Sequence, residues 1–166
     1  GENGSLPHAI PGDRVVQLGD MITFDFGAKK NGYCADMTRT VAVGQPKPEM
    51  KRIYDVVLEA QETCQAALAP GKCCKDIDAM ARKIIDGAGY AGRFGHGLGH
   101  AVGIDIHEEP RLSQLCEDIL QPGHTITVEP GIYVPGLGGV RIENTCAITE
   151  TGARTLVHAQ KALLIL

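Results

Sequence analysis

Residues 19–27 read GDMITFDFG, and residues 123–131 read GHTITVEPG. The two stretches align without a gap, and the acidic residue of the first, Asp25, falls on the acidic residue of the second, Glu129. Similarity at a fixed offset within one chain indicates a repeated structural unit. We therefore interpret the chain as two related halves, each containing a strand that carries a carboxylate.

A second pair of acidic residues extends this internal repeat. Beyond the turn that follows each strand, DMT at residues 36–38 falls on ENT at residues 143–145, so that Asp36 matches Glu143. Each half then presents two carboxylates on one hairpin. A duplication explains this agreement better than chance does.

The first hairpin has the clearest turn signal of the chain. Strand-like runs at residues 21–26 and 34–43 flank Asn31-Gly32. This dipeptide between two such runs is the strongest short-range hairpin signal. It predicts an antiparallel pair of strands.

A turn centred on this dipeptide also sets the register of the hairpin. It places Asp25 opposite Thr38 and Asp36 opposite Gly27. The two aspartates are then diagonal neighbours on one face of the sheet. Such neighbours lie about 7 Å apart, within reach of a shared ion.

Apolar residues at helical spacing predict two helices between the hairpins, over residues 46–69 and 76–86. Further strands are expected at residues 125–128, 140–149 and 163–166. This mixture of elements predicts an α+β fold. Because two helices precede the second hairpin and none precedes the first, we expect a matching helical segment to be missing before Gly1.

Four carboxylates in one buried site would repel one another strongly. Glu129 and Glu143 flank the second turn, around Pro135-Gly136, and could face each other across their strands. Without a counter-ion, the pKa values of such a group of carboxyls would have to rise. Two divalent cations cancel four negative charges, and oxygen ligands with one imidazole suit Mn²⁺ better than they suit a thiolate-type zinc site.

The imidazole is expected from residues 94–108, which read FGHGLGHAVGIDIHE. Three of the six histidines of the chain fall within twelve positions of this stretch. An isolated histidine is more often a hydrogen-bonded structural residue. The clustering favours a functional site here.

The bulk composition is that of one globular domain. At 166 residues, 43% of them hydrophobic, the chain is long enough to bury a core. Its formal charge is -4 without a basic block, which disfavours nucleic acid as a partner. No membrane-spanning or secretory segment is evident, and we expect a cytoplasmic protein without a membrane partner.

The six cysteines are scattered and lack the paired spacing of a zinc ribbon or the density of a disulfide scaffold. We expect them to be reduced thiols. A redox or metal-binding pair at Cys73-Cys74 is the less favoured alternative.

The stretch from His96 to Glu108 resembles the signature of the proline peptidases, which include Xaa-Pro aminopeptidases and Xaa-Pro dipeptidases (prolidases). Other blocks of this family are similar to DFGA at 25–28, DMTRT at 36–40, VEPG at 128–131 and RIEN at 141–144. The resemblance covers the chain from about Leu6 onward. It implies the pita-bread (creatinase/aminopeptidase) fold with two duplicated halves, the helices of the first half being absent. Residues 1–166 would be the C-terminal portion of a metallopeptidase catalytic domain, without its leading helices and N-terminal domain.

The resemblance also implies the ligands of a two-metal site. Asp36 and Glu143 would bridge the two ions, Asp25 would bind one ion, and His100 and Glu129 would bind the other. Mn²⁺ is the favoured metal, with Co²⁺ or Zn²⁺ as alternatives.

Further residues of the implied site are catalytic or line the substrate. His8, His96 and His107 would line the substrate, with His96 or His107 donating to the developing oxyanion. Arg141 matches an arginine of the family's site. Glu129 would accept or shuttle the proton of the attacking water in addition to its role as a ligand.

The implied reaction is hydrolysis of the N-terminal Xaa-Pro bond of peptides or dipeptides with proline at position two. A homodimer is left open. One alternative is a methionine aminopeptidase, which His96 and the short gap between Glu129 and Glu143 disfavour. Another is a non-catalytic pita-bread module that binds peptides or histones, although such relatives usually lose ligands.

Overall fold

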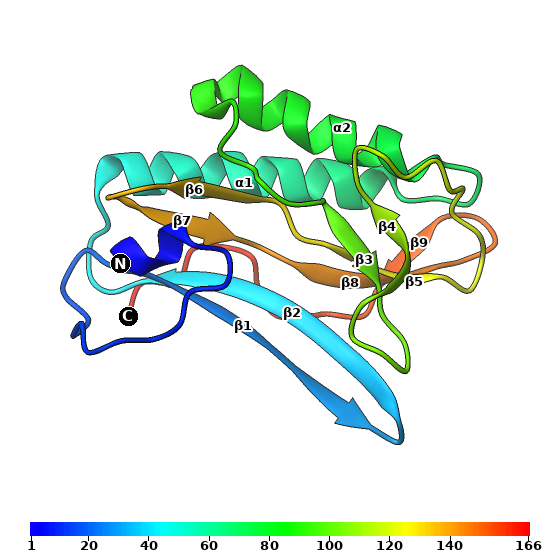
Figure 1. Cartoon of the computed structure of the whole chain (residues 1–166), viewed down its shortest axis with the longest axis horizontal. Coiled ribbons are helices and arrows are strands. Elements are labelled where there is room, and N and C mark those ends of the chain that lie inside the picture. The colour runs from blue at the N-terminus through cyan, green and yellow to red at the C-terminus, as the bar shows by residue number, and fades with distance from the viewer.

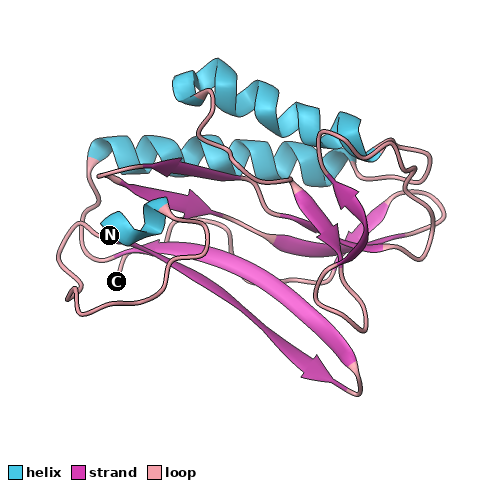
Figure 2. Cartoon of the chain, in the orientation of Figure 1, coloured by secondary structure: helices cyan, strands magenta, loops and turns pink.

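The computed structural model describes residues 1–166, with two helices packed together over one side of the strands (Figure 1). The helical elements are η1 (Glu2–Ser5), α1 (Pro48–Ala67), α2 (Cys74–Ile85) and the short η2 (Asp86–Tyr90). The strands are β1 (Met21–Lys30), β2 (Tyr33–Ala42), β3 (Gly99–Ala101), β4 (Glu108–Leu112), β5 (Thr125–Val128), β6 (Gly131–Val134), β7 (Gly138–Arg141), β8 (Asn144–Ile148) and β9 (Ala153–Thr155). Figure 2 shows helices and strands in separate layers, and the predicted α+β class is confirmed.

The β1–β2 hairpin has the predicted register. Asp25 pairs with Thr38, and Gly27 pairs with Asp36. Asn31 and Gly32 take φ angles of 53° and 88°, which is the left-handed backbone that a two-residue hairpin turn requires. Both strands run up to this turn, so β1 is longer than predicted and β2 is shifted by one residue. Figure 1 shows the tip of the hairpin projecting away from the helices.

The second half of the chain forms two antiparallel ladders. One is a five-stranded sheet of order β4-β3-β5-β8-β9, and the other is the β6–β7 hairpin. Val128 pairs with Asn144 where the first ladder ends, and Gly131 pairs with Arg141 where the second begins. The single strand predicted over residues 140–149 is thus divided into β7 and β8.

The break between these ladders has a simple cause. Pro130 lacks an N–H group and cannot donate to a ladder. The neighbouring amides find other partners: Glu129 N–H donates to Leu98 O at 2.8 Å, and Glu143 N–H donates to Thr38 O at 3.0 Å. In the shared register, two residues on from the Gly131 pair, Glu129 falls opposite Glu143. The break therefore leaves the backbone of Glu143 free to bond to Thr38 of the first hairpin and that of Glu129 free to bond to Leu98.

The core lies between the two helices and the strands of the second half. Helix α1 begins with Pro48 in its first turn and buries Ile53 and Val57, and α2 buries Ile77. These side chains belong to one cluster with strand residues such as Ile126. Each fully buried aliphatic side chain contributes about 1.5–3 kcal/mol. No helix combines the length and the apolar character that crossing a membrane demands.

The prediction of a strand at residues 163–166 was wrong. This segment lies parallel to the end of β2, but only Ala42 and Ile165 form a bridge, and that bridge is isolated. The hydrogen bonds of this segment reach only the end of β2 and the residues after it: Ala42 N–H donates to Leu164 O, Leu166 N–H donates to Ala42 O, and Gly44 N–H donates to Leu166 O. The apolar run at 163–166 predicted a strand because periodicity cannot show how many residues will pair with a neighbouring strand.

All six cysteines are free thiols, of which Cys64, Cys74 and Cys146 are buried. Burial raises the pKa of the Cys64 and Cys74 thiols to about 12 and that of Cys146 to about 11. Because the thiolate is the nucleophile, these three should resist alkylation. We expect iodoacetamide at pH 8 to modify at most the other three cysteines of the folded protein, and all six after denaturation, as read by mass spectrometry. Modification of Cys64 in the folded protein would contradict this expectation.

Candidate metal centre

One cavity of about 290 Å³ brings the predicted site residues together. Every side chain named from the sequence lines it: His8, Asp25, Asp36, His96, His100, His107, Glu129, Arg141 and Glu143. These residues come from the segment before β1, from both strands of the first hairpin, from β3 and the loops on either side of it, and from the end of β7 and the break between the ladders of the second half. The duplicated halves therefore face each other across the cavity.

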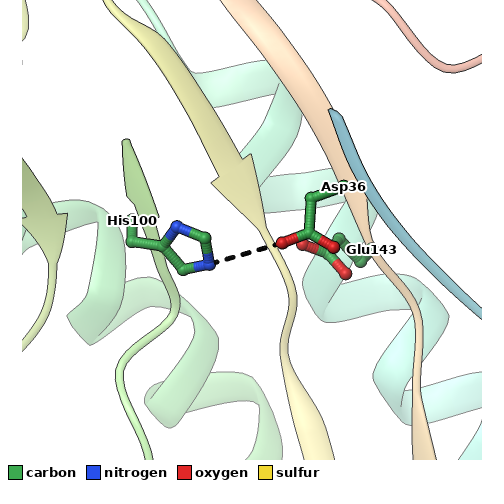
Figure 3. A group of neighbouring side chains, drawn as sticks. All are labelled: Asp36, His100 and Glu143. Atoms are coloured by element: carbon green, nitrogen blue, oxygen red, sulfur yellow. Dashed lines mark ion pairs between the residues drawn. The ribbon is translucent and has the colours of Figure 1, made fainter. Parts of the chain in front are cut away.

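Three ligand-type side chains form its centre. Asp36 on β2, His100 on β3 and Glu143 between β7 and β8 each place one ligand atom within 4.8 Å of the others. Figure 3 shows the His100 imidazole facing the two carboxylates, with an ion pair to Asp36. His100 Nε2 lies 3.7 Å from Asp36 Oδ2 and 3.2 Å from Glu129 Oε1. Four of the five predicted metal ligands are thus linked through one imidazole.

Glu143 is the most constrained of the carboxylates. Only 1% of the residue is exposed, and its Oε2 accepts a hydrogen bond from Thr38 Oγ1 at 2.6 Å. Its Oε1 is buried without any hydrogen-bond partner. Burial, with the nearby charges of Glu129 and Asp36, raises the pKa of Glu143 to about 9. A buried carboxyl oxygen without a donor is costly unless a cation or a proton satisfies it.

The pKa of Asp36 is raised for the same reasons as that of Glu143, but by less. Burial and then the charges of Asp25 and Glu129 raise the pKa of Asp36 to about 6. Glu129 differs, because His100 and other positive groups outweigh its burial and hold its pKa below the usual value. Thr127 Oγ1 also donates to Glu129 Oε1 at 3.1 Å. The cavity therefore contains more negative charge than its own donors satisfy.

Asp25 is held to one side of this centre. Its Oδ2 accepts a hydrogen bond from Arg141 Nη2 at 2.6 Å, and its side chain is 46% exposed. The same guanidinium approaches Glu129 at 3.9 Å and donates to the Tyr133 hydroxyl at 3.2 Å. Arg141 thus connects the ligand predicted for one ion to a ligand predicted for the other.

The remaining histidines surround the centre. His96 Nε2 lies 2.7 Å from the Tyr133 hydroxyl, and the His107 ring packs edge-on against His100 at 4.5 Å between centroids. His8 lines the cavity next to Pro7, whose carbonyl accepts a hydrogen bond from Arg141. All three histidines lie in the lining of the cavity.

Some residues of the site were not anticipated from the sequence, among them Thr38, Tyr133, Arg111 and Ser113. The repeat contained a signal for the first, because Thr38 matches Thr145. Each threonine contacts the acidic residue of the other half: Thr38 reaches Glu143, and Thr145 Oγ1 donates to Asp36 O at 2.7 Å. Nothing in the local pattern indicated the other three.

The residues present fit divalent cations. Carboxylate oxygens with one imidazole are ligands that hard and borderline divalent ions accept. The partnerless oxygen of Glu143 and the raised pKa of Asp36 are what a site short of positive charge would show. The donor set and its charge thus agree with a metal centre.

Fold and cavity together are those of a metallopeptidase. The chain belongs to metallopeptidase family M24, whose family model matches residues 1–150. It is 48% identical over 164 residues to the Xaa-Pro dipeptidase of Pyrococcus furiosus, a match that covers 99% of this chain and 47% of that protein.

Solved structures agree in fold. The prolidase from Pyrococcus horikoshii OT3 superposes with a TM-score of 0.96 at 44% identity, covering 99% of this chain and 47% of that chain. The X-Pro aminopeptidase from Thermotoga maritima MSB8 superposes with a TM-score of 0.94 at 40% identity, covering 98% and 46%. The predicted pita-bread fold is thereby confirmed. The chain spans about half the length of the relatives it matches.

Proposed function

We propose that residues 1–166 are the metal-binding part of a peptidase that hydrolyses the N-terminal Xaa-Pro bond of short peptides. The observation that carries this proposal is the convergence of Asp36, His100 and Glu143, with Glu143 Oε1 buried and without a partner. Membership of a metallopeptidase family supports the metal, and the relatives named Xaa-Pro dipeptidase and X-Pro aminopeptidase support the substrate class.

We propose that five side chains would hold two divalent ions. Asp36 and Glu143 would contribute to both ions, Asp25 to one, and His100 with Glu129 to the other. Mn²⁺ is the metal we favour, because the donors are mostly oxygen. When bound, such a pair of ions polarises a carbonyl group and lowers the pKa of a water molecule toward neutrality.

The chain's own residues position these ligands. Thr38 donates to Glu143, and Thr127 donates to Glu129, so that each glutamate keeps one orientation. Arg141 orients Asp25 through a bond of 2.6 Å between its guanidinium and the carboxylate. Such partners fix the geometry of a ligand before substrate arrives. Glu129 is the group we assign to accept the proton of the attacking water.

The cavity suits the amino end of a short peptide. Its lining consists of charged and polar side chains, glycines and Pro7, so an uncharged apolar ligand would find few partners. A free α-amino group carries positive charge and is attracted by the carboxylates that surround the centre. The cationic side chain of Arg111, which also lines the cavity, could pair with the carboxylate of a dipeptide.

An activity assay with three classes of substrate tests the proposal. The Mn²⁺-loaded protein is incubated with Xaa-Pro dipeptides, longer peptides with proline at position two, and Met-Ala peptides, and released amino acids are identified. We expect release of the residue before proline and its loss after chelation. Release of methionine from Met-Ala peptides alone would indicate a methionine aminopeptidase, and no release from any substrate would favour a binding module.

His107→Ala should leave the metal in place and slow turnover. The His107 ring packs against the ligand His100 but lies outside the three-residue centre, so it is free to donate to the substrate oxyanion. We expect a fall in kcat of roughly 10²–10³-fold, as for one lost oxyanion donor. Steady-state kinetics with metal analysis measures both quantities, and exposed His158 provides the control as His158→Ala. Wild-type turnover would remove His107 from the mechanism.

A further inference from the structure

A buried ion pair on helix α2 lies behind the cavity. Arg82 donates to both oxygens of the Asp78 carboxylate, from Nε at 2.7 Å and from Nη2 at 3.1 Å. The Asp78 side chain is fully buried, and that of Arg82 is 19% exposed. Taking two charges out of water costs several kcal/mol per ion, and a buried pair is weak evidence for stability by itself. The other groups that the two side chains bind indicate the role of the pair.

Both members of the pair bind the backbone of residues 94–98. Arg82 Nη1 donates to Phe94 O at 2.9 Å, and Nη2 donates to His96 O at 2.7 Å. Asp78 Oδ1 accepts the Leu98 N–H at 3.0 Å. The guanidinium also lies over the Phe94 ring at 4.5 Å. Every second residue of the segment is therefore anchored to the same ion pair.

This segment leads directly into the candidate metal centre. Its middle residue, His96, lines the cavity, and its Nε2 lies 2.7 Å from the Tyr133 hydroxyl. Its last residue, Leu98, accepts the backbone N–H of Glu129 at 2.8 Å. The ligand His100 follows two residues later. A displacement of the segment would thus move a substrate-lining histidine and a predicted ligand together.

The composition of the segment explains why such anchors are needed. Glycines occupy positions 95, 97 and 99 and alternate with the anchored residues. Glycine restricts its own backbone less than any other residue, so the segment has little intrinsic preference for one conformation. At Gly99 a side chain is excluded, since an added Cβ would lie 2.0 Å from Thr127 O. External hydrogen bonds must therefore supply the order that side chains cannot.

We propose that Asp78 and Arg82 are positioning residues of the peptidase site, which hold His96 and the backbone beside Glu129 in their working places. The inference rests on the proposed function, because that function gives His96 and Glu129 their roles. Neither Asp78 nor Arg82 lines the cavity, so both act through the 94–98 backbone. The hydrogen bonds of this pair are distinct from those that Thr38, Thr127 and Arg141 donate to the carboxylates of the site.

Arg82→Lys is the decisive variant. Lysine keeps the positive charge beside Asp78 but lacks the planar fork that reaches two carbonyl groups at once. We expect kcat/KM for an Xaa-Pro peptide to fall by about 10–100-fold, the range found when a supporting partner of a site is lost. The content of Mn²⁺ per folded chain should stay at the wild-type value. Hydrogen exchange at the Leu98 amide should become faster, because the segment loses two of its anchors.

Lys51→Met provides the matched control. Lys51 and Asp55 form an ion pair with the same spacing on α1, but both side chains are exposed and bind no backbone of the site. This variant should leave kcat/KM and exchange at Leu98 unchanged. Arg82→Lys with wild-type kcat/KM would overturn the proposal, whether or not exchange at Leu98 changes. The proposal would also be overturned if the activity of Arg82→Lys fell only in proportion to the amount of folded, metal-loaded protein.

The two proposals fail in different ways. If the wild-type protein releases no residue from Xaa-Pro peptides, the proposed function is wrong, and kinetics cannot test the role of the Asp78–Arg82 pair. Exchange at Leu98 in Arg82→Lys then decides alone whether the ion pair holds the 94–98 segment, and unchanged exchange would overturn that anchoring. If the wild-type protein is active, kcat/KM of the variant decides whether the anchoring matters for the site.

Discussion

Glu143→Gln should remove bound metal and stop hydrolysis while leaving the fold intact. Glutamine has the shape of glutamate and can still accept the hydrogen bond from Thr38 through its amide oxygen. The amide carries no charge, and its nitrogen would occupy the place of the partnerless Oε1. Because we propose that Glu143 contributes to both ions, we expect its neutralisation to weaken the binding of both. Activity should fall by more than the roughly 10²–10³-fold that one oxyanion donor is worth.

Metal analysis after gel filtration, together with peptide hydrolysis, measures this effect. Glu150→Gln is a suitable control, since Glu150 is exposed and outside the cavity and should keep both metal and activity. Unfolding midpoints of both metal-free variants show whether the fold survives. Stoichiometric metal retained by Glu143→Gln would count against the bridging assignment, even if activity were lost.

Arg39→Met should lower the free energy of unfolding more than the other substitutions that we predict. Arg39 on β2 is 9% exposed and donates five hydrogen bonds. Its guanidinium binds the carbonyls of Thr38 and Glu143 and, on its other side, those of Ala159 and Gln160. Methionine fills similar space but leaves these buried acceptors without a donor. Hydrogen bonds to charged groups contribute about 1.5–3 kcal/mol each, so we expect a loss of at least about 3 kcal/mol.

For a chain of this size, about 3 kcal/mol corresponds to a fall in Tm of roughly 6–12 °C. We also expect weaker metal binding, by about 10–100-fold, because the backbone of Glu143 loses the donor that holds it. Calorimetry and metal titration measure the two effects. Arg154→Met is the control, because Arg154 is exposed, and it should leave both unchanged. A Tm within about 2 °C of the wild-type value would show that water replaces the guanidinium without cost.

Local chemistry explains why the first hairpin was predicted with its correct register. Asn31 and Gly32 accept the left-handed backbone of a tight turn, and the period of two then places Asp25 and Asp36 on one face. The helices were found for a similar reason, because apolar spacing predicts which face is buried. Their ends differ from the prediction by one or two residues, which is the usual uncertainty of a helix boundary.

The contacts between the two halves had no comparable signal. Thr38 and Glu143 are separated by 105 positions, and no local pattern states that one hydroxyl will reach the other carboxylate. The same holds for Arg39, which joins β2 to residues 159–160. The strand predicted at 163–166 was wrong because only Ile165 forms a bridge, to Ala42 of β2, and this pairing also joins residues far apart in the chain.

The motifs of the sequence indicated the family and the ligand-type residues through their resemblance to known blocks, and turn geometry and side-chain alternation, which act over a few positions, indicated the hairpins. Three features required the folded chain: the break at Pro130 that frees the backbones of Glu129 and Glu143 for other partners, the unpaired oxygen of Glu143, and the Asp78–Arg82 pair that binds the glycine-rich segment. Each of these features depends on atoms that packing of the core brings together. The free energy of that packing is distributed over many residues, so no single stretch of sequence determines it.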